Sequence, residues 1–287
     1  MSIEIRGLTI TIGDKPIVRD ACMDIADGER IGLVGSSGSG KSMIAKALMG
    51  LLPDTARVSG SIMAGGRQLI GLDDTAMADL RGRYMGMVFQ NPAAALNPVM
   101  TVAQQIGLPL YLHYDLSLDE RLDRVKAMLD KVGLSQDALL KYPHQLSGGQ
   151  QRVGIATALI TSPRFIIADE PTTALDSITQ RQIVDLLTSL VDDAGASMLF
   201  ITHDFAVLAR ATTRCYVLDG GSIAETGTTA SLLREPASEP ARRLVAAARQ
   251  LTLSRDGGIG DGDVGSREST GVESGDGTIV RKDGGDE

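Results

Sequence analysis

The chain has 287 residues, of which 43% are hydrophobic, and this fits one α/β domain with an inserted subdomain and a tail. Its formal net charge of −8 provides no basic surface of the kind that nucleic-acid binding requires, so no nucleic-acid partner is expected. No stretch approaches the roughly 18 consecutive apolar residues of a membrane span, and the start of the chain lacks a signal-peptide layout. We therefore expect a cytosolic chain that reaches any membrane through a partner.

The first half of the chain is predicted to begin with strands and then to become helical. Strands are predicted at residues 3–12, 29–34, 58–63 and 85–89. A glycine-rich loop follows the second of these, and a helix begins after it at Lys41 and ends near Gly50. From residue 91 to about residue 142 apolar residues recur at helical spacing, as in Leu122, Val125, Leu129 and Val132. This change of period predicts an inserted helical subdomain.

The second half alternates helices with strands and ends in a polar segment. Helices are predicted at residues 151–161, 179–191 and 241–250, and strands at residues 164–168, 197–201, 214–218 and 222–225. This alternation implies a mostly parallel sheet covered on both faces. Residues 254–287 are glycine-rich and hold nine acidic against four basic side chains. They are predicted to form a disordered acidic tail.

The chain contains two cysteines, Cys22 and Cys215, which are far apart in the sequence. Both lie in apolar or strand-like segments. Two buried thiols in a reducing compartment are therefore favoured over a disulfide.

Residues 35–42, GSSGSGKS, match the phosphate-loop pattern GxxxxGK followed by Ser or Thr without a mismatch. The glycines let backbone N–H groups turn toward the β- and γ-phosphates of a nucleotide, and the N-terminus of the following helix adds positive potential. Lys41 would neutralise the terminal phosphates, and the Ser42 hydroxyl would bind Mg²⁺. The predicted phosphate-binding residues are Gly35, Ser36, Ser37, Gly38, Ser39, Gly40, Lys41 and Ser42.

Two acidic residues follow the strand predicted at residues 164–168. Asp169 ends an apolar run and is suited to a direct or indirect hold on Mg²⁺. Glu170 comes next, where a general base could polarise an attacking water. Taken alone, such a pair is more often a helix cap. The motifs that surround the pair decide between the two interpretations.

The order of four motifs resembles the ATP-binding subunit of an ABC transporter. The motifs are the phosphate loop, LSGGQ at residues 146–150, the strand with Asp169 and Glu170, and a lone His203 after an apolar strand. The resemblance implies a P-loop NTPase core with a mostly parallel sheet, an N-terminal antiparallel β region and an α-helical subdomain inserted at about residues 91–160. It implies an ATPase domain at residues 1–253 that binds ATP and Mg²⁺.

The same resemblance assigns roles to single residues. Gln90 matches the Q-loop glutamine, which reaches the metal or the water, and His203 matches the switch histidine, which contacts the γ-phosphate. The string PTTALD resembles the D-loop with Asp176 as its acid, and this disfavours the helix-cap interpretation of Asp169 and Glu170. In the family, the signature acts across a head-to-tail dimer on the ATP of a second subunit. The signature residues here are Ser147, Gly148, Gly149 and Gln150.

The strings FQNPAAALNP and YPHQLSGG look like the branch of this family that imports peptides and nickel. That branch implies two integral membrane permease subunits, a second and non-identical ABC ATPase and, indirectly, an extracellular or periplasmic solute-binding protein. The implied location is the cytoplasmic face of the cell membrane. Two alternatives stay open: a non-transport accessory ATPase like that of phosphonate degradation, and a regulatory subunit that binds ATP but hydrolyses it poorly.

Three features depart from the family pattern. Ile12 stands where the family usually offers an aromatic ring to stack on adenine. Residues 234–245, REPASEPARRLV, keep only the outline of the C-terminal extension of the branch. The residue that usually separates LSGGQ from QRV is missing after Gln150. We expect the loop or the first helical turn to absorb this deletion, which predicts one weak and one strong composite site with a non-identical partner.

Overall fold

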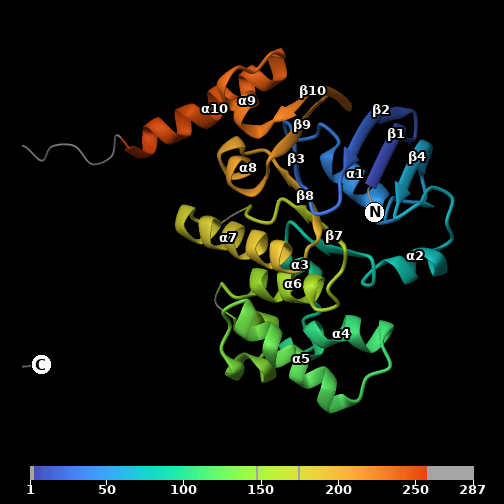
Figure 1. The fold of residues 1–287 in the computed structure, drawn as a ribbon, viewed down its shortest axis with the longest axis vertical. Helices are drawn as coiled ribbons and strands as arrows, with labels where there is room; N and C mark the ends of the chain where they lie inside the picture. The colour runs from blue at the N-terminus through green and yellow to red at the C-terminus, as the bar shows by residue number, and fades with distance from the viewer. Residues whose placement is uncertain (1–2, 147, 174, 257–287) are drawn as a thin grey trace, which may run out of the picture.

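The computed structural model of the chain describes residues 3–146, 148–173 and 175–256. An antiparallel sheet lies at one side of a larger sheet, and a group of helices forms the opposite end of the molecule (Figure 1). The strands are β1 (Ile3–Ile12), β2 (Lys15–Ile25), β3 (Arg30–Val34), β4 (Ala56–Ala64), β5 (Arg67–Gln68), β6 (Met85–Val88), β7 (Phe165–Asp169), β8 (Ser197–Thr202), β9 (Arg214–Asp219) and β10 (Ser222–Thr228). The helices are α1 (Lys41–Leu48), α2 (Asp74–Leu80), α3 (Pro92–Ala95), α4 (Val102–His113), α5 (Leu118–Lys131), the 3-10 helices η1 (Gln136–Leu140) and η2 (Pro143–Gln145), α6 (Gln150–Leu159), α7 (Ser177–Asp193), α8 (Phe205–Ala211), α9 (Thr229–Arg234) and α10 (Glu239–Asp256).

The larger sheet has the strand order β10-β9-β3-β8-β7-β6. Neighbours from β9 to β6 run parallel, and β10 pairs with β9 antiparallel. Strands β6, β7 and β8 are buried along their whole length, which is the continuous apolar character of strands covered on both faces. Because these strands are parallel, the segments that follow β3, β6, β7 and β8 meet at one edge of the sheet.

Two hydrophobic cores lie on the two faces of this sheet. In β7, Phe165 and Ile167 pack into a core with α1 and the antiparallel sheet. The alternate residues Ile166 and Ala168 pack into a second core with α4 to α8 and α10. Because successive side chains of a strand point to opposite faces of the sheet, β7 contributes to both cores.

The N-terminal antiparallel sheet has the order β2-β1-β4-β5. The register of β1 against β2 shifts in three places, and Asp20 in β2 has a positive φ of 47°. In β2, Ala21 and Met23 are buried while Cys22 between them is exposed, and Cys215 on β9 is buried. Both thiols are free. The prediction of two buried thiols is thus wrong for Cys22, because the pleat of β2 turns its side chain away from the core.

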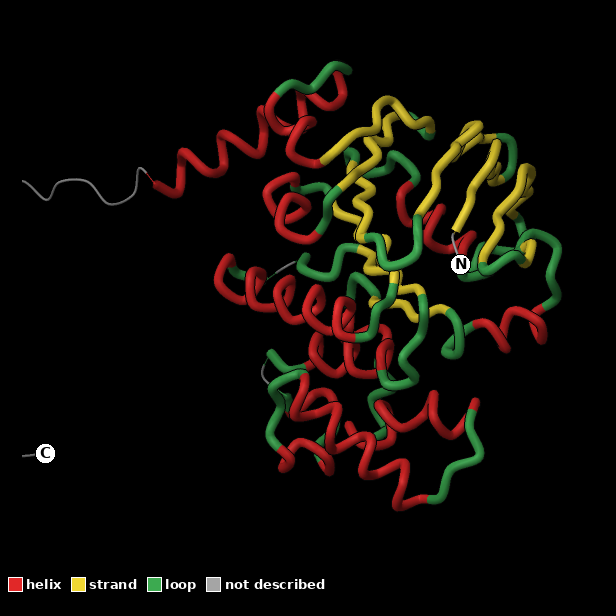
Figure 2. Tube along the Cα trace, viewed as in Figure 1, coloured by secondary structure: helices red, strands yellow, loops and turns green. Residues whose placement is uncertain are grey.

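A helical region forms the lower end of the molecule in Figure 2. Capping boxes start α4 at Thr101 and α5 at Ser117. On α5, Val125 and Leu129 are buried, as their spacing predicts. Helix α6 packs against α4 and also against β6 and α7, so it joins this region to the sheet.

The C-terminal part of the described chain is helix α10, which ends at Asp256. The tail predicted from residue 254 therefore starts inside a helix. Residues 257–287, which make up the rest of the predicted tail, lie outside the described residues.

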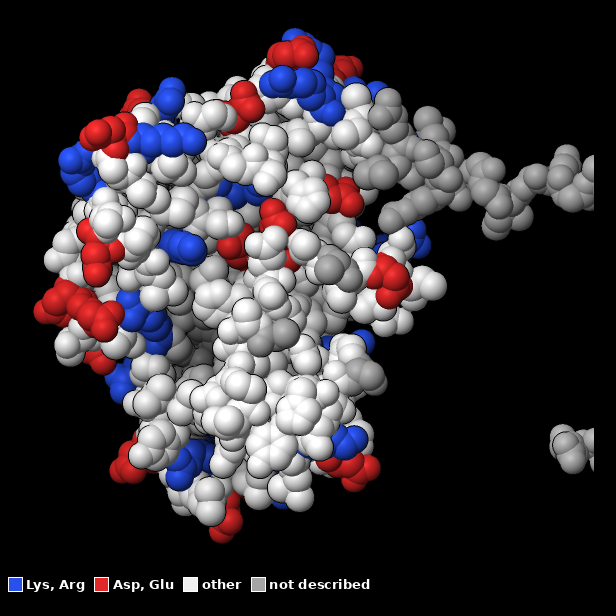
Figure 3. Space-filling view, turned by 180° about the vertical axis from the view of Figure 1, so that it is seen from behind, with Lys and Arg blue, Asp and Glu red and all other residues white. Residues whose placement is uncertain are grey.

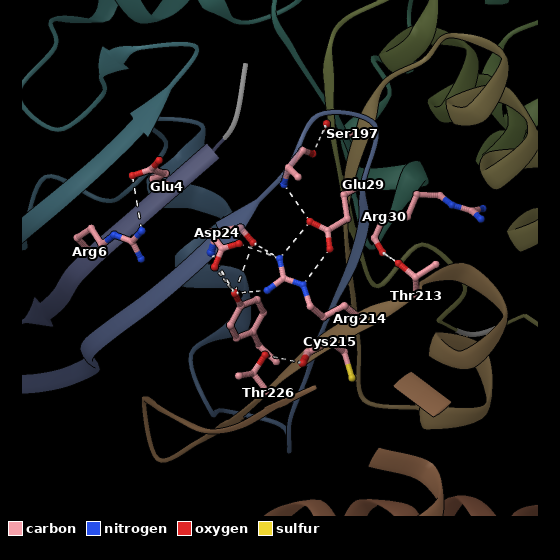
Figure 4. A network of polar contacts seen from close by, with 12 residues as sticks. Glu4, Arg6, Asp24, Glu29, Arg30, Ser197, Thr213, Arg214, Cys215 and Thr226 are labelled. Atoms are coloured by element: carbon pink, nitrogen blue, oxygen red, sulfur yellow. Dashed lines mark hydrogen bonds and ion pairs between the residues drawn. The ribbon is translucent and has the colours of Figure 1, made fainter. Parts of the chain in front are cut away.

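A polar cluster fixes β9 against the turn between β2 and β3 (Figure 4). Arg214 Nε donates to Glu29 Oε1 at 2.8 Å, and Arg214 Nη2 donates to Asp24 Oδ2 at 2.9 Å. Arg214 Nη1 donates to the Tyr216 hydroxyl at 2.8 Å. The guanidinium lowers the pKa of Glu29, because its hydrogen bonds favour the charged carboxylate. This cluster holds β2 of the antiparallel sheet against β9, which pairs with the strand that precedes the phosphate loop.

Candidate active site

The phosphate loop lies between β3 and α1, as the sequence predicts. A Cβ on Gly35 would lie 2.3 Å from the Leu218 carbonyl oxygen, and a Cβ on Gly40 would lie 2.9 Å from the Ile17 carbonyl oxygen. Gly40 also has a φ of 109° and caps α1 without a side-chain hydrogen bond. Glycine is therefore required at both positions, and the N-terminus of α1 keeps its anion-binding capacity. The cradle fits a phosphate group.

Lys41 is buried at the base of this loop, with 4% of its surface exposed. Its Nζ donates to the carbonyl oxygens of Gly35 at 2.8 Å and of Ser36 at 3.0 Å. The same nitrogen lies 3.9 Å from Glu170 Oε1. Burial lowers the pKa of Lys41, while the carboxylates of Glu170 and Asp169 act in the opposite direction. The loop thus holds a cation ready for the phosphates of a nucleotide.

Asp169, the last residue of β7, lies beside the first turn of α1. The Ser42 hydroxyl donates to Asp169 Oδ1 at 3.1 Å. Asp169 is 6% exposed, and burial raises its pKa against the opposing effects of the Ser42 hydrogen bond and of Lys41. A carboxylate and a hydroxyl at this spacing are oxygen ligands of the type that Mg²⁺ prefers. The two residues therefore fit the predicted metal site.

Glu170 is the point at which the other predicted catalytic residues meet. Its Oε2 accepts hydrogen bonds from Gln90 Nε2 at 3.1 Å and from Thr173 Oγ1 at 2.9 Å. His203 Nδ1 lies 3.4 Å from the same oxygen. Glu170 has a positive φ of 45°, a conformation that is rare outside glycine and is found preferentially at functional sites. Segments that follow β6, β7 and β8 thus converge on one carboxylate.

These groups surround a cleft of about 850 Å³, which is a size typical of ligand sites. The cleft is lined by Ile12, Lys15, Ile17, Ser36, Ser37, Gly38, Gly40, Lys41, Ser42, Met43, Gln90, Glu170, Thr173, His203 and Leu244. Of the predicted phosphate-loop residues, Gly35 and Ser39 lie behind this wall. Ser39 is buried, and its hydroxyl has no hydrogen-bond partner among the described residues.

The signature residues lie at a different cleft, of about 610 Å³. Gly148 and Gln150 line it together with Gln90, and Gly149 is the N-cap of α6. Gln150 Nε2 donates to the Pro143 carbonyl at 2.9 Å. Ser147 lies outside the described residues. Gln90 and Thr173 line both clefts, so within one chain the described part of the signature lies at a cleft that adjoins the cleft of the phosphate loop.

Asp176 occupies the N-cap of α7. The Thr179 hydroxyl donates to Asp176 Oδ2 at 2.6 Å, and Asp176 Oδ1 accepts hydrogen bonds from the backbone N–H groups of Thr179 and Ile178, each at 3.0 Å. These bonds, the one from the Thr179 hydroxyl above all, lower the pKa of Asp176. Asp176 is absent from the described residues that line either cleft. The structure thus gives it a capping contact within the chain, and its contact with a nucleotide stays a prediction.

Comparison with known proteins decides the family of the chain. The family model described as ABC transporter matches residues 18–173. The chain is also 39% identical over 247 residues to the dipeptide transport ATP-binding protein DppD of Bacillus subtilis, covering 84% of this chain and 74% of that protein. This chain belongs to the ABC transporter family. A second ABC relative, the oligopeptide transport ATP-binding protein OppD of Mycobacterium tuberculosis, is 42% identical over 242 residues, covering 81% of this chain and 39% of its own length.

Solved ABC structures share the fold. A dimeric ATP-binding cassette in a post-hydrolysis state, bound to ADP and Pi, matches with a TM-score of 0.71 at 31% identity, covering 79% of this chain and 98% of that chain. A subunit of the ABC transporter complex cbiONQ of Clostridium perfringens matches with a TM-score of 0.72 at 27% identity, covering 89% of this chain and 96% of that chain. The predicted ABC ATPase fold and the prediction of ATP as its nucleotide are confirmed.

Several residues that line the cleft of this ABC ATPase were not predicted from the sequence. Thr173 lies in the PTTALD string, so its closeness to Glu170 could have marked it. Lys15 and Ile17 come from β2, which the sequence pattern does not reveal. Leu244 comes from α10, far beyond the motifs, and the sequence carries no signal for its position.

Proposed function

We propose that this chain is the ATP-hydrolysing subunit of an ABC importer for peptides, nickel or a related small solute. The observation that carries the proposal is the convergence of Gln90, Thr173 and His203 on Glu170. The carboxylate of Glu170 itself lies 3.9 Å from the Lys41 ammonium. This arrangement is suited to hydrolysis rather than to binding alone. Relatives named as oligopeptide and dipeptide transport ATP-binding proteins support peptides as the class of cargo.

The proposed reaction is the attack of water on the γ-phosphorus of ATP, which breaks the bond to the β-phosphate oxygen and yields ADP and phosphate. Backbone N–H groups of the phosphate loop and Lys41 hold the phosphates. Glu170 takes the proton of the attacking water, and Gln90 and His203 orient that water. Mg²⁺ would be held by Ser42 and Asp169, with Gln90 nearby, and would neutralise phosphate charge.

The signature is proposed to act on a second subunit. Gly148 and Gln150 line the adjoining cleft, and neither they nor Gly149 between them are among the described residues that line the phosphate-loop cleft of their own chain. We therefore assign them to the ATP of a partner in a head-to-tail dimer. Ser147 and Asp176 are assigned to the same contact. The partner is a non-identical ABC ATPase, so that each nucleotide lies between two different subunits.

A groove between α4 and α5 is the proposed docking site of the permease. It has a volume of about 290 Å³ and an apolar lining that includes Met100, Leu108 and Val125. Tyr111 and Leu118 at its rim are 65% and 73% exposed, which is unusual for large apolar side chains in a monomer. Seen from behind, the helical end of the molecule also carries a broad area without charged residues (Figure 3). Two permease subunits would dock in this way, one on each ATPase.

The same partners set the proposed location. In the described part of the chain, no helix combines the length and apolar character of a membrane span. We infer that the permeases hold the ATPase at the cytoplasmic face of the membrane, and that an extracellular or periplasmic solute-binding protein delivers cargo from the other side.

The experiment is a pull-down of the tagged chain from membranes, followed by mass spectrometry and an ATPase assay. We expect two permeases, a second ABC ATPase and Mg²⁺-dependent hydrolysis. A Lys41→Ala variant should recover the same partners but bind ATP much more weakly. Recovery of soluble proteins without a permease would refute the transport role, and unchanged ATP binding in Lys41→Ala would refute the assignment of the phosphate loop.

A further inference from the structure

The nucleotide cleft has an apolar part that none of the motifs occupies. Ile12 at the end of β1 and Ile17 in β2 line it together with Leu244 of α10, and all three are half-buried. The phosphate loop fixes where the triphosphate binds. The base of the nucleotide must then lie against the part of the wall that lacks phosphate ligands.

The turn between β9 and β10 lies between Leu244 and the residues of the antiparallel sheet. A second, smaller hollow of about 250 Å³ is lined by Ser36, Asp219 and Leu244, among others. After Asp219, the chain passes beside Ile17, because a Cβ on Gly221 would lie 2.4 Å from the Ile17 carbonyl oxygen. The segment from Asp219 to Gly221 therefore borders both Leu244 and Ile17.

Helix α10 is held firmly in this position. Ala241, Val245 and Ala248 are buried, and the helix packs against α8, β9 and β10. Arg243 Nη2 lies 3.8 Å from Oδ2 of Asp219, the last residue of β9. The buried residues recur at a spacing of four and three, so they lie on one face of α10 and set the orientation of the helix about its own axis. In this orientation Leu244, beside the buried face, lines the cleft.

The segment before α10 is anchored as well. The Glu225 carboxylate accepts hydrogen bonds from the backbone N–H groups of Ala237 at 2.9 Å and Ser238 at 2.7 Å. Bonds of this charge-assisted kind are stronger than neutral ones. The entry point of the helix is therefore set by β10, and Leu244 is presented to the cleft by a rigid element.

Among the described residues that line the cleft, none is phenylalanine, tyrosine or tryptophan. The imidazole of His203 lies at Glu170, beside the phosphate loop, so it is not available to the base. Ile12 stands at the end of β1, and its aliphatic side chain offers one surface to a base. An adenine ring against that surface would leave much of its apolar area in water unless another side chain covered it.

We propose that Leu244 of α10, with Ile12 and Ile17, forms an aliphatic seat for the adenine base. This inference rests on the proposed function, since it assigns a further binding residue to the same ATP site. Leu244 lies outside residues 18–173, which the family model matches. The C-terminal helix thereby becomes part of the nucleotide site.

The test is to compare MgATP with magnesium tripolyphosphate, which has the phosphates but no base, by titration calorimetry on the full chain. Leu244→Ala should weaken ATP binding about fivefold, because the change removes an apolar contact worth ~1 kcal/mol. The affinity for tripolyphosphate should stay within about twofold of the parent value. An Ile12→Tyr change in the Leu244→Ala variant should recover the lost ATP affinity by stacking on the base.

A matched control is Leu140→Ala, which makes the same change at a side chain that is 82% exposed on η1. It should alter neither affinity. Equal ATP affinity in Leu244→Ala and the parent would overturn the inference and leave the proposed function intact. Equal weakening of ATP and tripolyphosphate in Leu244→Ala would also overturn it, because the effect would then lie at the phosphates. If the parent bound neither ligand, the proposed function would fail and the inference with it.

Discussion

Substitution of Glu170 by glutamine separates binding from hydrolysis. The amide has the same shape as the carboxylate and can still accept the hydrogen bond that Thr173 Oγ1 donates at 2.9 Å. It cannot accept a proton from water at neutral pH. Loss of a general base reduces a rate by about 10²- to 10⁴-fold, which corresponds to ~3–5 kcal/mol in the barrier. We therefore expect turnover at least about a hundredfold lower.

Nucleotide binding should survive the same substitution. Glu170 Oε1 lies 3.9 Å from Lys41 Nζ, so the carboxylate partly neutralises the cation that is to meet the phosphates. Removing that negative charge reduces repulsion in the cleft, and the affinity for MgATP should stay equal or rise by up to about tenfold. Hydrolysis is measured by phosphate release at saturating MgATP, and binding by equilibrium titration.

Glu235→Gln is a suitable control, because it makes the same chemical change at an exposed position that follows α9. Both turnover and affinity should remain at the parent level. The assignment of Glu170 as the base would be refuted by a Glu170→Gln variant whose turnover stays within about threefold of the parent.

Three further predictions concern the loop, the polar cluster and the signature. Gly35→Ala should abolish ATP binding measured by titration, because its Cβ would lie 2.3 Å from the Leu218 carbonyl oxygen; unimpaired binding would show that the loop can move away. Arg214→Met should lower the free energy of unfolding by about 2 kcal/mol in urea titrations at neutral pH, and no loss would contradict the role given to the cluster. The pKa of Glu29 is lowered below its ordinary value of 4.5 in the folded parent. The stability that the parent has over Arg214→Met should therefore be complete above pH 4.5. It should shrink as the pH falls through the lowered pKa of Glu29. Insertion of one residue after Gln150 should raise the turnover of the assembled complex, whereas an unchanged or lower rate would count against a weakened composite site.

The parts of the fold that the sequence predicts well are those in which local pattern and tertiary environment agree. Strands β3, β7 and β8 are short apolar runs, and the structure places them within one or two residues of the prediction. The residues that follow β6, β7 and β8 lie close together, because the ends of parallel strands share one edge of the sheet. Glu170 contacts Gln90 and His203 there, and the catalytic roles of these three residues stay predictions.

The parts that escape prediction depend on contacts between distant segments. Strand β2 has an irregular register and a positive φ at Asp20, so its alternation of apolar and polar residues is broken. Helices α2, α8 and α9 have six or seven residues each, too few to show a clear period. The position of Leu244 depends on how α10 packs against α8 and β9, and the spacing of residues along the chain carries no record of that packing.

Gln90 belongs to two parts of the molecule at once. Its side chain donates to Glu170 beside the phosphates, and the chain continues from it directly into α3 and the helical region that carries the α4–α5 groove. A displacement of Gln90 therefore changes the surroundings of the catalytic carboxylate and the position of the groove together. Thermodynamic linkage is reciprocal: if a bound nucleotide strengthens docking at the groove, docking strengthens nucleotide binding by the same free energy. A permease that docked at this groove and favoured one position of Gln90 would by the same amount favour one nucleotide state of the site.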